Sequence, residues 1–116
     1  PEETIAAFSQ LAAERGLWLI LDETYRDFLP PDQQRPHGLF ESGLPDHVIS
    51  LYSFSKAYCL PGYRLGALTA PPALQAELSK ALDTVQICPP RIGQLAVAAT
   101  MAATLAWREE NRRAMA

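Results

Sequence analysis

The residues best suited to chemistry in this chain cluster around Lys56. Lys56 follows Ser53 and Ser55 in the run S-F-S-K, and Arg64 comes eight residues later in P-G-Y-R-L-G. A lysine amine can form a Schiff base with an aldehyde, as in covalent catalysis by amines. Serine hydroxyls and backbone N–H groups, together with a permanently charged guanidinium, can bind a phosphate. The joint pattern therefore predicts a site for a phosphorylated ligand held through a lysine.

A second group of polar residues lies upstream, where the apolar run L-W-L-I-L ends in D-E-T-Y. Ligands of open α/β sheets gather at the carboxyl ends of strands, which is where this pattern places Asp22 and Tyr25. The Asp22 carboxylate could keep a pyridine nitrogen protonated, which makes the ring an electron sink. The Tyr25 phenol could donate to a ring oxygen and stabilise its anion. Together with the Lys56 stretch, these residues fit pyridoxal phosphate (PLP), whereas Glu23 is expected to point elsewhere.

Each of these residues also has a structural interpretation when it is taken alone. Asp22 is compatible with a helix N-cap or a surface ion pair, and Tyr25 with a half-buried loop tyrosine. Lys56 is compatible with a lysine whose stem packs at a strand end while its amine reaches solvent. His37 and His47 lie in no motif and are interpreted as a loop and a strand-start histidine. The prediction of a PLP site therefore rests on the combination.

Hydrophobic periodicity predicts an α/β fold. The five apolar residues before Asp22 form a continuous run, which is typical of a strand buried on both faces. Gly, Pro and polar residues predict a long irregular connection over 28–46. We expect a partial mixed, mostly parallel sheet of about three strands with flanking helices. The expected elements are a helix over 2–15, strands over 17–21, 47–52 and 64–70, and helices over 73–87 and 91–113.

Composition narrows the class of protein. The 116 residues carry a net charge of −3 with acids and bases scattered. This argues against nucleic acid, because that partner requires a basic face. The sequence offers no apolar stretch of membrane-spanning length. Cys59 and Cys88 form no metal or redox spacing, so we expect no metal and interpret both as buried, reduced thiols in a cytoplasmic protein.

The pattern D-x-x-Y followed by S-x-S-K-x-x-x-x-P-G-x-R-x-G resembles the class I/II aminotransferases, which are fold-type I PLP enzymes. The resemblance implies that Lys56 forms the Schiff base with the cofactor and transfers the proton. It implies that Asp22 binds the pyridinium nitrogen and Tyr25 the 3-oxygen. Ser53 and Arg64 would bind the phosphate, with Ser55 as a further contact.

The resemblance also carries expectations about the whole protein. Residues 1–116 would be one segment of a large PLP-binding domain in a longer, homodimeric chain, with the lysine strand between the other two strands. The parent would transfer an amino group from an amino acid to a 2-oxo acid, and the isolated segment would be inactive. Two alternatives stay open: another fold-type I enzyme such as a decarboxylase or C–S lyase, and a non-catalytic aminotransferase-like regulator domain.

Overall fold

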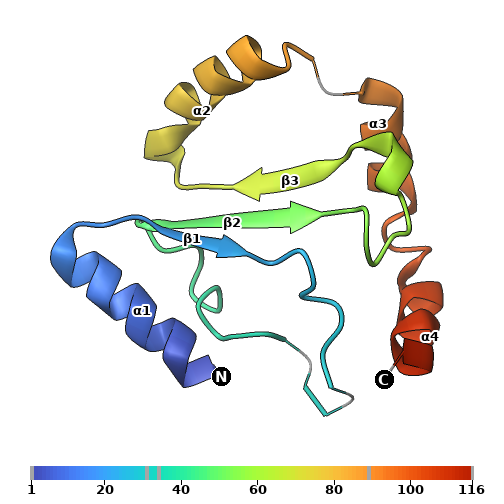
Figure 1. Ribbon diagram of the computed structural model, residues 1–116, viewed down its shortest axis with the longest axis horizontal. Coiled ribbons are helices and arrows are strands. Elements are labelled where there is room, and N and C mark those ends of the chain that lie inside the picture. Colours follow the sequence, from blue (N-terminus) through green and yellow to red (C-terminus); the bar gives the residue numbers. More distant parts are fainter. Residues whose placement is uncertain (1, 31, 34, 89, 116) are drawn as a thin grey trace.

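A three-stranded sheet forms the centre of the computed structural model, which describes residues 2–30, 32–33, 35–88 and 90–115 (Figure 1). A short 3₁₀ turn, Pro61–Tyr63, precedes the third strand. Within these ranges no helix is long and apolar enough to cross a bilayer. The helices and strands in chain order are α1 (Glu2–Arg15), β1 (Leu19–Asp22), β2 (Val48–Ser53), β3 (Gly66–Thr69), α2 (Pro72–Val85), α3 (Arg91–Thr100) and α4 (Leu105–Met115).

The sheet has the strand order β1-β2-β3, so the strand that leads to Lys56 is central, as predicted. β1 runs parallel to β2, with Asp22 opposite Leu51. β3 runs antiparallel to β2, with Gly66 opposite Ser53. The predicted α/β fold with a mixed sheet is confirmed: one strand pair is parallel and the other antiparallel.

This topology brings three chain segments to one edge of the sheet. The carboxyl ends of β1 and β2 lie at the same edge because the two strands are parallel (Figure 1). β3 starts at that edge because it runs in the opposite direction. The segments after Asp22, after Ser53 and before Gly66 therefore meet there.

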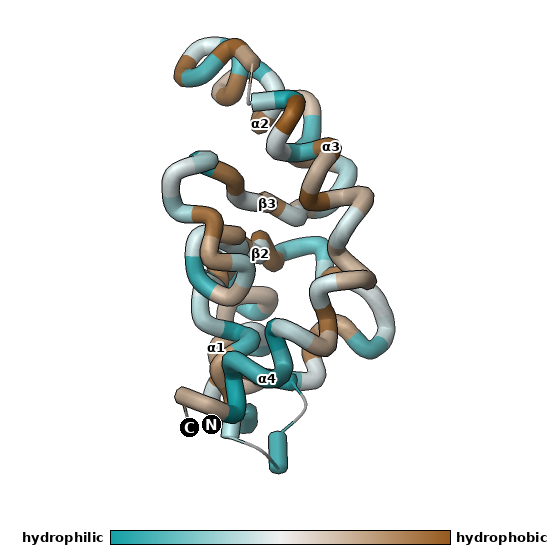
Figure 2. Tube along the Cα trace, turned by 90° about the vertical axis from the view of Figure 1, so that its right-hand side faces the viewer, coloured by the Kyte–Doolittle hydropathy of each residue, from teal (hydrophilic) through white to brown (hydrophobic). Residues whose placement is uncertain are grey.

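The apolar core of this chain is small, and Val48 is its one large residue buried below 2% exposure among the described residues. The prediction that strand 17–21 is buried on both faces is wrong. Ile20 is 59% exposed, and β1 alternates between half-buried and exposed residues. The reason is that alternate side chains of β1 point to opposite faces, and the face that carries Ile20 stays exposed while α1 packs against the strand. In Figure 2, hydrophobic residues recur along α2 and α3, whereas α4 is largely hydrophilic.

Two further expectations are corrected by the structure. The helix predicted over 91–113 is interrupted by a turn at residues 101–104, which separates α3 from α4. The Thr100 hydroxyl donates to the Ala96 carbonyl at 2.7 Å, and the Thr104 hydroxyl donates to the Met101 carbonyl at 3.1 Å. Such side-chain bonds to backbone carbonyls compete with regular helix geometry. The cysteines Cys59 and Cys88 are free but exposed, since both lie in connecting segments.

Truncating Val48 should destabilise the chain far more than truncating an exposed valine. Val48 has 0% exposure, whereas Val85, the matched control position, is 85% exposed. Val48→Ala is expected to lower the free energy of unfolding by about 2 kcal/mol, because the substitution leaves a cavity. Val85→Ala is expected to change it by no more than about 0.5 kcal/mol. Urea unfolding of both variants measures the difference, and equal losses would contradict this description of the core.

Candidate active site

Three of the predicted site residues line one open pocket at the carboxyl edge of β1 and β2. The pocket has a volume of ≈ 490 Å³ and includes Asp22, Tyr25 and Lys56. Asp22 ends β1, Tyr25 lies in the turn that follows, and Lys56 lies in the turn after β2. The remaining lining residues are Ile5, Leu21, Glu23, Thr24, Arg26, Leu29, Pro36 and His37.

The Asp22 carboxylate is held as an anion by Thr24. The Thr24 backbone N–H donates to Asp22 Oδ1 at 3.0 Å, and the Thr24 hydroxyl donates to the same oxygen at 2.6 Å. These two bonds lower the pKa of Asp22, because donors favour the charged form of a carboxylate. The side chain is exposed at the pocket and is therefore an ionised acceptor for a positively charged group.

Lys56 and Tyr25 approach each other across the pocket. The Lys56 Nζ lies 5.5 Å from the centroid of the Tyr25 ring. This distance is within the range of a cation–π contact. Tyr25 is 61% exposed, and Lys56 is exposed as well. An amine and a phenol are thus both accessible to a ligand that enters the pocket.

The predicted phosphate-binding residues lie outside this pocket. The Ser55 N–H donates to Ser53 Oγ at 3.2 Å, which links the last residue of β2 to the turn that follows it. Arg64 adopts a left-handed backbone conformation with φ of 53° and donates from Nη1 to the Pro61 carbonyl at 2.9 Å. Arg64 lines a separate hollow between β3 and α2. The structure therefore brings Asp22, Tyr25 and Lys56 to one pocket, whereas Ser53 ends β2 and Ser55 and Arg64 lie in neighbouring turns.

The sequence analysis missed a buried polar cluster beside the pocket. Glu23 does not point away: it is 7% exposed and lines the pocket. Its carboxylate accepts a hydrogen bond from the Ser50 hydroxyl, and its Oε1 lies 3.1 Å from His37 Nε2. The Leu39 N–H donates to His37 Nδ1, so Nε2 carries the proton and donates to Glu23. The available signal was an acid directly after a strand, paired with a serine inside the next strand.

A second cluster joins the turn after β1 to α4. The Tyr52 hydroxyl donates to Asp27 Oδ2 at 2.5 Å, and Arg108 Nη1 donates to Asp27 Oδ1 at 3.1 Å. Burial raises the pKa of Tyr52, and the neighbouring Asp27 raises it further. The phenol therefore stays protonated, since both effects disfavour its anion. The Arg108 guanidinium lies 4.4 Å from the centroid of the Tyr58 ring.

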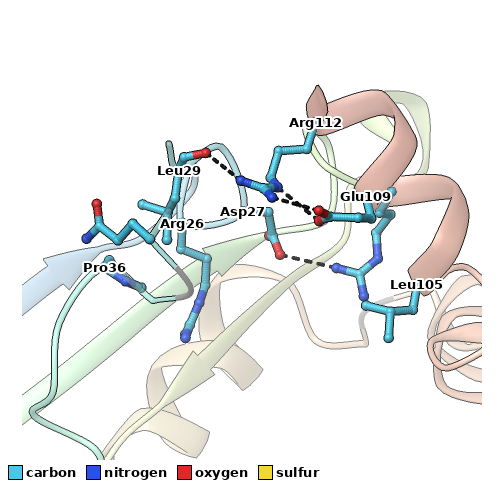
Figure 3. Close-up of a pocket in the computed structure, with 9 residues that line it drawn as sticks. Arg26, Asp27, Leu29, Pro36, Leu105, Glu109 and Arg112 are labelled. Atoms are coloured by element: carbon cyan, nitrogen blue, oxygen red, sulfur yellow. Dashed lines mark hydrogen bonds and ion pairs between the residues drawn. The ribbon is translucent and has the colours of Figure 1, made fainter. Parts of the chain in front are cut away.

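A further hollow lies next to this second cluster, between α4 and the residues Arg26, Asp27, Leu29, Gln33 and Pro36 (Figure 3). Arg112 Nη1 donates to the Leu29 carbonyl at 2.7 Å, and Arg112 Nη2 donates to Glu109 at 2.6 Å. Arg112 lowers the pKa of Glu109 to about 2, which keeps the carboxylate charged. These charged groups bond to one another and to the backbone, and these bonds hold α4 against the segment that follows β1.

Comparison with known proteins agrees with the fold and the motif. The model of the family "Aminotransferase class I and II" matches residues 1–116. The chain is 34% identical over 97 residues to the aromatic aminotransferase ISS1 of Arabidopsis thaliana, covering 81% of this chain and 23% of that protein. It is 35% identical over 103 residues to histidinol-phosphate aminotransferase 2 of Ralstonia nicotianae, covering 89% of this chain and 26% of that protein.

Solved structures show the same arrangement of elements. The α-aminoadipate aminotransferase LysN of Thermus thermophilus, complexed with N-(5'-phosphopyridoxyl)-L-leucine, superposes with a TM-score of 0.79 at 30% identity. The alignment covers 97% of this chain and 29% of LysN. This chain belongs to the class I and II aminotransferase family. It spans about a quarter of the length of the curated relatives it matches.

Proposed function

We propose that residues 1–116 are a segment of the PLP-binding large domain of an aminotransferase. The parent enzyme transfers an amino group from an amino acid to a 2-oxo acid. The observation that supports this most directly is the shared pocket, which is lined by Lys56, Asp22 and Tyr25. Membership of the aminotransferase family supports the same reaction. This chain covers only 23% of the aromatic aminotransferase ISS1. We therefore assign the amino acid and the 2-oxo acid as substrates to the parent protein and not to this segment alone.

The residues present fit the cofactor that this family implies. PLP supplies an aldehyde that an amine can attack and a protonated pyridine ring that accepts negative charge from the substrate. The Asp22 carboxylate, with its lowered pKa, is an ionised partner for the pyridinium nitrogen. Tyr25 has an exposed phenol that can donate to the ring oxygen. The Asp22 carboxylate therefore suits the positively charged ring nitrogen, and the Tyr25 phenol suits the negatively charged ring oxygen.

Lys56 has two roles in this proposal. Its Nζ would hold the cofactor covalently, and its amine, when free, would transfer a proton to and from the substrate α-carbon. Lys56 is exposed and lines the pocket, so its amine is accessible to an amino acid. General acid–base transfer by a positioned group contributes about 10²–10⁴-fold to a rate.

Ser53, Ser55 and Arg64 are proposed to bind the phosphate. Ser53 ends β2 and Ser55 lies in the turn directly before Lys56, whereas Arg64 lies beside the start of β3 at the same edge of the sheet. The Arg64 guanidinium donates one N–H to Pro61, and it carries further N–H groups that suit phosphate oxygens. Binding the phosphate requires Arg64 to turn from its present hollow toward the Lys56 turn.

The setting of the parent protein is part of the same proposal. We propose a homodimer, as the family resemblance implies. The exposed apolar residues Ile20, Val85 and Ile92 are suited to burial against further protein. The two free cysteines suit a reducing, cytoplasmic compartment. The matches to proteins named as aminotransferases do not favour the alternatives of a decarboxylase, a C–S lyase or a regulator domain.

Covalent trapping of PLP tests the proposed anchor. PLP is titrated into the purified parent protein while the visible absorbance is followed, and borohydride is then added. We expect a borohydride-stable adduct on the peptide that contains Lys56 and no such adduct in Lys56→Ala. Lys80→Ala is the control, because Lys80 is an exposed lysine on α2 that pairs with Glu77. An adduct on another lysine, or none at all, would refute the assignment of Lys56.

A further inference from the structure

Two carboxylates fasten the turn that carries Tyr25, one on each side of it. Glu23 lies two residues before Tyr25, and its carboxylate accepts the Ser50 hydroxyl bond. Asp27 lies two residues after Tyr25, and its Oδ2 accepts the Tyr52 hydroxyl bond at 2.5 Å. Tyr25 therefore sits midway between two points of attachment.

Both attachments are made to the same strand. Ser50 and Tyr52 belong to β2 and are two residues apart, so their side chains leave the same face of the sheet. β2 continues directly into the turn that contains Lys56. The two hydrogen bonds from Ser50 and Tyr52 thus hold the turn around Tyr25 against β2, the strand that leads to Lys56.

Each carboxylate also has a partner from a distant segment. His37 Nε2 donates to Glu23 Oε1 at 3.1 Å, and Arg108 Nη1 donates to Asp27 Oδ1 at 3.1 Å. Arg26 Nη1 approaches Glu23 Oε1 at 3.5 Å. A carboxylate that accepts several bonds is held in one orientation, and removal of one donor leaves the others in place.

Tyr25 itself is 61% exposed, and its ring contacts the Phe28 ring of the same segment at 6.0 Å between centroids. Its contact with Lys56, at 5.5 Å from Nζ to the ring centroid, depends on the backbone of the turn. Misplacement of a catalytic group by about 1 Å can cost about 10²-fold in rate. The hydrogen bonds that attach the turn to β2 therefore determine the distance between Tyr25 and Lys56.

We propose that Glu23 and Asp27 are positioning residues that, through Ser50 and Tyr52, hold the Tyr25 phenol at the ring oxygen of PLP. This inference rests on the proposed function, since it assumes that Lys56 carries the cofactor. In this arrangement the carboxylates of Glu23 and Asp27 are bonded to the Ser50 and Tyr52 hydroxyls. They act through Tyr25, whose hydrogen bond lowers the pH at which the Lys56–PLP adduct loses its proton.

The test is a pH titration of the visible absorbance of the Lys56–PLP adduct in the full-length parent protein. Tyr25→Phe removes the phenol hydroxyl and therefore gives the largest shift that loss of its hydrogen bond can cause. We expect the midpoint to move upward by roughly one pH unit. Glu23→Gln and Asp27→Asn keep the size of each side chain, and each should shift the midpoint upward by a smaller amount. Tyr52→Phe is a milder variant that removes one donor while the Asp27–Arg108 pair remains. Asp46→Asn, at an exposed loop position, should leave the midpoint unchanged.

Double variants separate positioning from a general loss of structure. In a Tyr25→Phe background, Asp27→Asn and Glu23→Gln should add no further shift, because they act through the missing phenol. A further shift in that background would overturn the proposal, and so would wild-type midpoints for Glu23→Gln, Asp27→Asn and Tyr52→Phe. If the wild-type protein forms no borohydride-stable adduct at Lys56, the proposed function fails first and this inference fails with it.

Discussion

Lys56→Arg is expected to lower the turnover number of the parent aminotransferase by about 10³-fold or more. Arginine keeps the positive charge, but its guanidinium stays protonated and can neither form the Schiff base nor accept a proton from carbon. Lys56 is exposed in the turn after β2, so the larger side chain fits without repacking a core. Both the covalent anchor and the proton transfer are lost in one substitution.

Steady-state rates with saturating amino acid, 2-oxo acid and PLP would quantify this loss. Lys80→Arg is the matched control, since Lys80 is exposed on α2 and should retain wild-type turnover. Circular dichroism of Lys56→Arg should match the wild type. A Lys56→Arg enzyme that keeps its rate within about tenfold would contradict the assignment of general acid–base catalysis to this residue.

Asp22→Asn is expected to produce the second largest loss, about 10²–10³-fold in turnover, because it removes the charge that we propose to face the pyridinium nitrogen. Asparagine retains a side-chain oxygen for the two Thr24 donors, so the turn after β1 should keep its shape. The expected loss of turnover in Asp22→Asn therefore comes from the missing charge and not from a change in the turn. Asp83→Asn, at an exposed position on α2, is the control with an expected wild-type rate.

The same carboxylate predicts a pH dependence with a defined sign. The folded-state pKa of Asp22 is lowered, first by the Thr24 hydroxyl and then by the Thr24 N–H. The charged form therefore persists as pH falls below the ordinary value, and its contribution is lost only as pH falls through the lowered pKa. Thr24→Val removes the hydroxyl bond, so the acidic limb of the profile of kcat against pH should move to higher pH. An unchanged acidic limb in Thr24→Val would contradict the role of Thr24.

Much of the local structure could be predicted because it depends on short-range patterns. The apolar run before Asp22 and the run before Ser53 correctly indicated adjacent strands, and the lysine strand is central as expected. The expected strand over 64–70 is shorter, since Arg64 adopts a left-handed conformation and β3 begins at Gly66. The expected helix over 91–113 divides at a turn, where threonine hydroxyls bond to backbone carbonyls. Helix periodicity continues across that turn and gave no sign of it.

The sequence by itself determined the family motif, the α/β class, and the placement of Asp22, Ser53 and Lys56 at strand ends. These properties follow from backbone preferences and side-chain alternation over a few residues. The tertiary structure alone decided which side chains meet: Lys56 with Tyr25 in one pocket, Glu23 with His37, and Asp27 with Arg108. The last pair is 81 residues apart in the chain, so its contact depends on how α4 packs against the turn after β1. No local pattern encodes such a meeting, because it is the packing of whole elements that brings the two charges together.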